Sequence, residues 1–157
     1  MSARKLVKHL EAAVLTILGV SMTVVMIVNV IMRYFFESSL IWAEEFIRIG
    51  FVWAMFIAIT TGFIRHEHIG FDALMRRTRF TTRLRDVLYG VALVTVGALT
   101  AWFGNIYNGF VGSVSLAGTN LPTAVLLLPG IVAGAAWCVI GLAIIGTALF
   151  RPRAEKE

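Results

Sequence analysis

The stretch AAVLTILGVSMTVVMIVNVIM, from Ala12 to Met32, contains no charged side chain. A membrane-spanning helix needs about 20 consecutive apolar residues, so this stretch is long enough to cross a bilayer. It continues into RYFFES rather than into a small-residue cleavage site, so we interpret it as a retained span and not as a secretory signal. The sequence therefore predicts an integral membrane protein.

Three more apolar stretches follow the first one. Of the 157 residues, 59% are hydrophobic and 15% are charged, whereas soluble domains carry about 25% charge. We expect one all-α domain over residues 1–157, with four transmembrane helices at about residues 12–36, 40–64, 87–110 and 122–150. The start of the fourth span has two alternatives. Pro129 either kinks a helix that begins near Pro122 or marks the first turn of the span itself.

The basic residues predict how the chain crosses the membrane. Twelve of its fourteen lysines and arginines lie in the N-terminal segment, in the loop between the second and third spans, or in the C-terminal tail. Such residues are enriched on the cytoplasmic side, so both termini are expected in the cytoplasm. The net charge of +5 then reflects topology and contact with anionic lipids, and nucleic acid is not needed to explain it. The loop segment ALMRRTRF, Ala73 to Phe80, predicts a helix that lies in the cytoplasmic interface.

Ionisable side chains interrupt the first two spans. If these spans form a hairpin that turns near Ser38 and Ser39, Arg33 lies at the depth of Glu44, and Asn29 at the depth of Arg48. Charged side chains in a span are costly, so we expect them to be paired, either to hold the hairpin together or to dock another membrane protein. We call the following residues the polar cluster: Asn29, Arg33, Trp42, Glu44, Glu45 and Arg48.

Glycines recur at helical spacing in the third and fourth spans. Small residues let transmembrane helices approach closely, so these glycines predict two packing stripes. Cys138 is the only cysteine, which excludes a disulfide or a thiolate metal site within one chain. The glycines of the two stripes are Gly90, Gly97 and Gly104 in the third span, and Gly130, Gly134 and Gly141 in the fourth.

The segment RHEHIGFD places His66, His68 and Asp72 at the end of the second span. These residues resemble metal ligands, but no second cluster completes a metal site, and haem ligation would need histidines that face each other from separate spans. Asp72 instead suits the start of the interfacial helix. We find no nucleophile and base pair and no phosphate-binding loop, so we expect no enzyme activity, no catalytic residue, no cofactor and no metal.

Four motifs follow one another along the chain: NVIMRYFF (29–36), WAEEFIRIGFVW (42–53), HIGFD (68–72) and TNLPTAVLLLPG (119–130). Their order resembles that in the small membrane subunit, a DctQ-like small permease, of tripartite ATP-independent periplasmic (TRAP) transporters. The resemblance implies a multi-pass protein of the bacterial inner membrane. It also implies a large membrane subunit and a periplasmic substrate-binding protein as partners, and symport of an organic acid with sodium or protons.

The two halves of the chain differ, because the first hairpin holds the polar cluster and the second holds no ionisable group. Transporters usually build their sites at the interface of matching repeats, so we expect a scaffold that binds no substrate and touches the binding protein only weakly or indirectly. One alternative is the membrane anchor subunit of a redox enzyme, against which the absence of facing histidines counts. Another is a small self-sufficient exporter that works as an oligomer.

The asymmetry of the basic residues predicts which loops are accessible from outside the cell. In a Cys138→Ala background, single cysteines at Ser113 or Ser115 should react with an impermeant thiol reagent in intact cells, while one at Arg79 should react only after lysis. Labelling of the Arg79 position in intact cells would show that the orientation is wrong.

Overall fold

The structure is a computed structural model that describes residues 3–65 and 82–150. These residues form four helices: α1 (Ala3–Phe35), α2 (Ile41–Arg65), α4 (Thr82–Val111) and α5 (Ala124–Phe150). Each contains a stretch long and apolar enough to cross a membrane, namely Lys8–Phe35, Ile41–Phe63, Asp86–Val111 and Ala124–Leu149. The predicted all-α membrane fold is therefore confirmed. The predicted interfacial helix lies outside the described residues.

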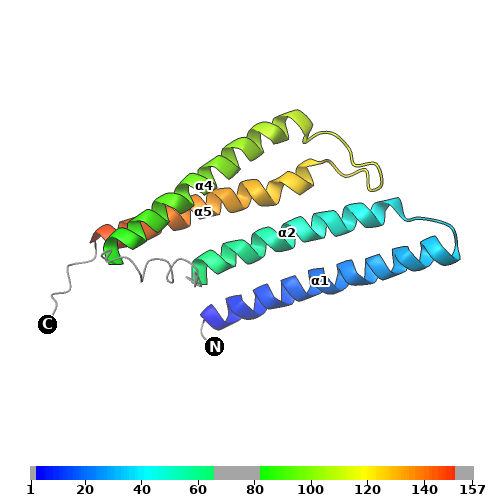
Figure 1. Cartoon of the computed structure of the whole chain (residues 1–157), viewed down its shortest axis with the longest axis horizontal. Coiled ribbons are helices and arrows are strands. Elements are labelled where there is room, and N and C mark those ends of the chain that lie inside the picture. The colour runs from blue at the N-terminus through cyan, green and yellow to red at the C-terminus, as the bar shows by residue number, and fades with distance from the viewer. Residues whose placement is uncertain (1–2, 66–81, 151–157) are drawn as a thin grey trace.

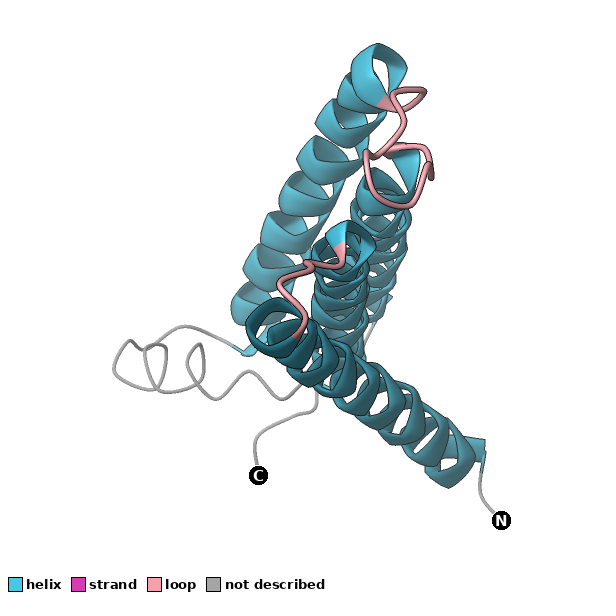
Figure 2. Cartoon of the chain, turned by 90° about the vertical axis from the view of Figure 1, so that its right-hand side faces the viewer, coloured by secondary structure: helices cyan, strands magenta, loops and turns pink. Residues whose placement is uncertain are grey.

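The helices form two hairpins that meet along α2 and α5. Figure 1 shows the α1–α2 turn and the α4–α5 loop at the same end of the bundle, which we call the turn end. Helix α2 packs against α1 on one side and against α5 on another, whereas α4 packs chiefly against α5. Figure 2 shows α1 diverging from the other helices. Helix α2 thus connects the two hairpins.

Helices α4 and α5 touch through their backbones at two pairs of glycines. A methyl group added at Gly97 would lie 2.6 Å from the carbonyl oxygen of Gly134, and one added at Gly134 would lie 2.7 Å from that of Gly97. Gly90 and Gly141 oppose each other in the same way, at 2.9 and 2.7 Å. Only glycine permits so close an approach, because any side chain would strike the facing backbone.

The two outer glycines of the predicted stripes have different neighbours. Gly104 faces the side chain of Ile131, and Gly130 faces the ring of Phe56 on α2. The α5 stripe therefore serves two contacts. Its later part packs on α4, while Gly130 makes room for an aromatic ring from the other hairpin.

Trp137 is the centre of the contact between α2 and α5. Its indole Nε1 donates a hydrogen bond to the hydroxyl of Thr60 at 2.9 Å. The rings of Phe56 and Phe63 pack against it, with centroids at 6.0 and 5.2 Å. Trp137 is 6% exposed and belongs to a small core with Leu93 and Ala133.

Pro129 lies inside α5, which begins at Ala124. The helix therefore begins before Pro129, and the proline lies within it. A proline inside a helix leaves the carbonyl of the fourth preceding residue without its partner, and here that residue is Val125. Trp53 of α2 supplies the missing donor, because its Nε1 lies 3.1 Å from the Val125 carbonyl oxygen. The carbonyl that Pro129 leaves free in α5 therefore forms a hydrogen bond between the two hairpins.

The glycine contacts predict a sharp difference between two glycines of α4. Gly97→Ala should destabilise the chain by about 1–3 kcal/mol, the usual cost of overpacking, because the new methyl group meets backbone. Gly109→Ala is the control, since nothing lies within 4 Å of a methyl group there. The measurement is thermal unfolding in detergent. Equal melting temperatures for the two variants would contradict the close glycine contact between α4 and α5.

Candidate subunit interface

Glu45 of α2 binds the loop between α4 and α5. Its Oε1 accepts a hydrogen bond from the backbone N–H of Gly118 at 2.8 Å. Its Oε2 accepts one from the N–H of Thr119 at 2.8 Å and one from the Thr119 hydroxyl at 2.7 Å. Hydrogen bonds to an ionised acceptor are among the stronger ones in proteins. We call this contact the Glu45 clamp.

The loop is shaped to present these donors. The backbone N–H of Leu116 donates a hydrogen bond to the Leu121 carbonyl at 2.8 Å, and the N–H of Asn120 donates to the Leu116 carbonyl at 3.0 Å. Asn120 adopts a left-handed conformation with φ of 54°, which asparagine tolerates better than most residues. A methyl group at Gly118 would lie 2.8 Å from the backbone nitrogen of Trp42. The loop therefore rests directly on the first turn of α2.

Asn29 connects α1 to the start of α2. Its Oδ1 accepts a hydrogen bond from the backbone N–H of Leu40 at 2.9 Å. This N–H lies just before α2, where backbone donors have no partner within the helix. Asn29 therefore acts as a cap for the neighbouring helix.

The hairpin register differs from the predicted one. Asn29 lies at the level of Leu40 rather than of Arg48, and Met22 contacts Gly50. Because residues 36–40 run back alongside α1, the end of α1 extends beyond the start of α2, as Figure 1 shows. The prediction that Arg33 and Glu44 share one depth is therefore wrong.

The pairing of the charged residues also differs from the predicted one. In residues 3–65 and 82–150, neither Arg33, Glu44 nor Arg48 forms an ion pair within 4 Å. Arg48 attracts Glu45 electrostatically along α2, but the carboxylate of Glu45 makes its hydrogen bonds to the loop. The polar cluster thus separates into two groups. Asn29 and Glu45 bind within the chain, whereas the other four residues are exposed, namely Arg33, Trp42, Glu44 and Arg48.

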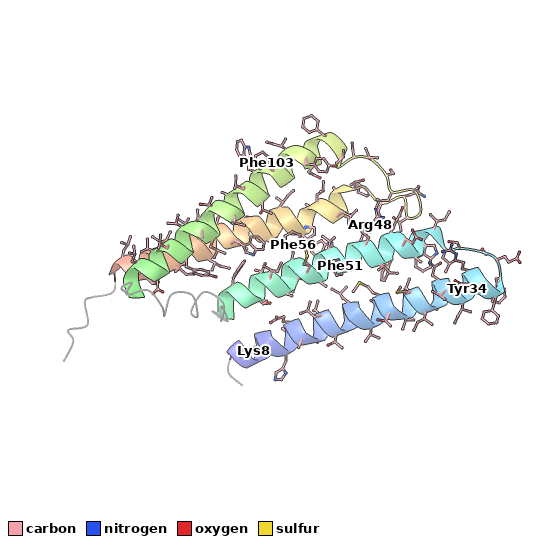
Figure 3. The ribbon with its side chains drawn as sticks, viewed as in Figure 1. Lys8, Tyr34, Arg48, Phe51, Phe56 and Phe103 are labelled. Carbon is pink, nitrogen blue, oxygen red and sulfur yellow. The ribbon has the colours of Figure 1, made fainter. Side chains whose placement is uncertain are left out.

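Helix α2 has three sides with different surroundings. Ala43 and Gly50 are buried on the side of α1, and Phe56 and Thr60 face α5. The third side is exposed, and its residues follow one another at helical spacing of three or four. Figure 3 labels Arg48, Phe51 and Phe56 along α2. We call the third side the open α2 face, and it consists of Glu44, Arg48, Phe51 and Met55.

The histidine segment cannot be placed in the same way. His66, His68 and Asp72 lie outside the described residues. Within the described part of the chain, no group of three metal-binding side chains occurs.

The sequence analysis did not identify the hydrogen-bond partners of Glu45, because Gly118 and Thr119 lie more than seventy positions away along the chain. The motif TNLPTAVLLLPG, which begins at Thr119, was the sequence feature that could have pointed to this loop.

Comparison with known proteins gives one family and one curated relative. The family of tripartite ATP-independent periplasmic transporters, DctQ component, matches residues 22–151. The chain is also 33% identical over 89 residues to the C4-dicarboxylate TRAP transporter small permease protein DctQ of Vibrio cholerae serotype O1. That alignment covers 52% of this chain and 38% of the relative, so the chain spans well under two thirds of the relative's length.

The Glu45 clamp predicts different effects for two adjacent glutamates. Glu45→Gln replaces one acceptor oxygen with an amide donor that faces the loop N–H groups, and an unsatisfied donor costs about 1–3 kcal/mol. We expect a lower melting temperature and faster proteolysis in the loop between α4 and α5. Glu44→Gln is the matched control, because Glu44 is exposed and its change should leave the isolated chain unaffected. Equal stability of the two variants would contradict the clamp.

Proposed function

Because this chain belongs to the DctQ family of tripartite ATP-independent periplasmic transporters, we propose that it is a scaffold that binds no substrate and holds a larger membrane subunit in place. Membership makes it a small permease component of a transporter rather than an enzyme, and a multi-pass protein of the inner membrane. The larger subunit then carries the substrate, while this chain stays fixed. Membership also counts against the anchor of a redox enzyme.

The observation that carries this proposal is the small and apolar interior. Among the described residues, the buried hydrophobic side chains are Ala43, Leu93, Ala133, Trp137 and Ala148, and no polar or charged residue is buried. Transport sites lie near the membrane midplane, where broken helices offer free backbone groups to the substrate or ion. In this chain the carbonyl freed by Pro129 is already bound by Trp53. These features of the described residues support a role other than substrate binding.

The contacts between the helices support the same role. The glycine pairs hold α4 against α5, and the Glu45 clamp, Trp53 and Trp137 hold α5 and its loop against α2. A support for a moving subunit must keep its own shape during the transport cycle. Contacts of this kind have discrete, close-packed geometries and resist gradual deformation.

The substrate, the driving ion and the other partners are proposed from membership in the DctQ family and from the charge distribution of this chain. We propose that the transported substrate is an organic acid, with C4-dicarboxylates as the first candidates, since the curated relative is named for them. A sodium or proton gradient drives import, and a periplasmic binding protein delivers the substrate. This chain touches the binding protein weakly or indirectly, because the connection from Val111 to Asn120 carries no charge. Its basic ends contact anionic lipids on the cytoplasmic side.

The scaffold role predicts the outcome of reconstitution. Liposomes that contain this chain alone should take up no C4-dicarboxylate under an imposed sodium or proton gradient, even when the binding protein is added. Liposomes that also contain the larger subunit are the control and should show uptake. Gradient-driven uptake by this chain without the larger subunit would overturn the scaffold assignment.

A further inference from the structure

We infer that the open α2 face is the surface on which a transmembrane helix of the larger subunit docks, and that this helix carries an acidic side chain at the depth of Arg48. The inference rests on the proposed function, because it names the surface by which the scaffold holds its partner. Three observations support it. Arg48 lies deep in its span, the carboxylate of Glu45 is already hydrogen-bonded within the chain, and the other exposed faces of the bundle carry no charge in their middle parts.

Arg48 lies deeper in its span than any other charged residue of the described spans. It stands seven residues after Ile41, where the candidate span begins, which corresponds to about 10 Å along a helix. By contrast, Lys8, Glu11, Arg33 and Asp86 lie within three residues of an end of their spans. An ionised side chain at such depth usually faces a bundle interior or a partner instead of lipid.

Arg48 is exposed in the described part of the chain. The two other sides of α2 are occupied by α1 and by α5 with its loop. Glu45, the nearest acid on the adjoining side, has both carboxylate oxygens engaged by Gly118 and Thr119. Glu44 is exposed beside Arg48 and forms no ion pair within 4 Å in the described part of the chain. Within the described part of the chain, Arg48 therefore has no ion-pair partner, and a helix that packs on this face can supply one.

Other exposed faces of the bundle differ from this one. The middle of α1 exposes Val20, Val24 and Ile27, and α4 exposes Leu99 together with the aromatic residues Trp102 and Phe103. All of these side chains are uncharged and suit lipid tails. The open α2 face combines Arg48 and Glu44 with Phe51, which is 61% exposed, and with Met55. Such a mixture of an aromatic anchor and charged groups is typical of binding hot spots.

Photo-crosslinking in the assembled complex tests the location of this surface. A photoreactive amino acid is placed at Phe51, and at Val24 on α1 and Leu99 on α4 as controls of similar exposure and depth. We expect at least a fivefold higher yield of adducts with the larger subunit from position 51 than from either control. Equal or higher yields from the controls, or an adduct of position 51 with a second copy of this chain, would overturn the inference.

Charge substitutions test the chemistry of the surface. Arg48→Gln should reduce co-purification of the larger subunit at least threefold and leave the melting temperature of the isolated chain unchanged. Arg48→Lys should restore part of the binding, and Arg33→Gln is the control that should bind as the unchanged chain does. Wild-type binding by Arg48→Gln would refute the charge pairing. If the unchanged chain binds no larger subunit at all, the proposed function fails; if it binds but Arg48 and Phe51 are irrelevant, only this inference fails.

Discussion

A single carboxylate fixes how the two hairpins sit against each other. Glu45 accepts hydrogen bonds from two backbone amides and one hydroxyl of a loop that lies 73 and 74 positions further along the chain. The same stripe of α2 continues with Trp53, which binds the Val125 carbonyl, and with Thr60, which accepts a bond from Trp137. These polar contacts recur every seven or eight residues, so they stay on one side of the helix. Each satisfies groups that lipid cannot hydrogen-bond.

The three helix contacts rest on different physical interactions. Helices α4 and α5 meet through glycine backbones, which allows dispersion contacts over a long seam. Helices α2 and α5 meet through side-chain hydrogen bonds and aromatic packing. Helix α1 is attached to α2 by the insertion of Met22 at Gly50 and by the Asn29 cap. Helices α2 and α5 each pack against two neighbours, and we place the further helix on the remaining side of α2 because that side carries Arg48.

Local patterns in the sequence predicted the four helices and the positions of the glycine stripes, because apolar length and helical spacing are visible within one segment. The hairpin register was predicted wrongly, since nothing local reveals that residues 36–40 run back along α1. The partners of Glu45 were missed for a similar reason: a loop more than seventy residues away supplies backbone N–H groups, which every residue carries. Pro129 left two alternatives in the sequence, and the contact with Trp53 explains why the proline is tolerated within α5. The orientation in the membrane and the interfacial helix stay predictions.

Helix α2 connects the two hairpins, and we propose that its exposed side binds a partner. The central claim about the chain is that the Glu45 clamp keeps the turn end of the bundle in one arrangement. The most direct measurement is the distance distribution between spin labels at Ser39 and Val114, recorded by double electron–electron resonance on the full chain in lipid nanodiscs. We predict one narrow distribution that is the same with and without the larger subunit. A broad or two-peaked distribution in the intact chain would contradict the claim.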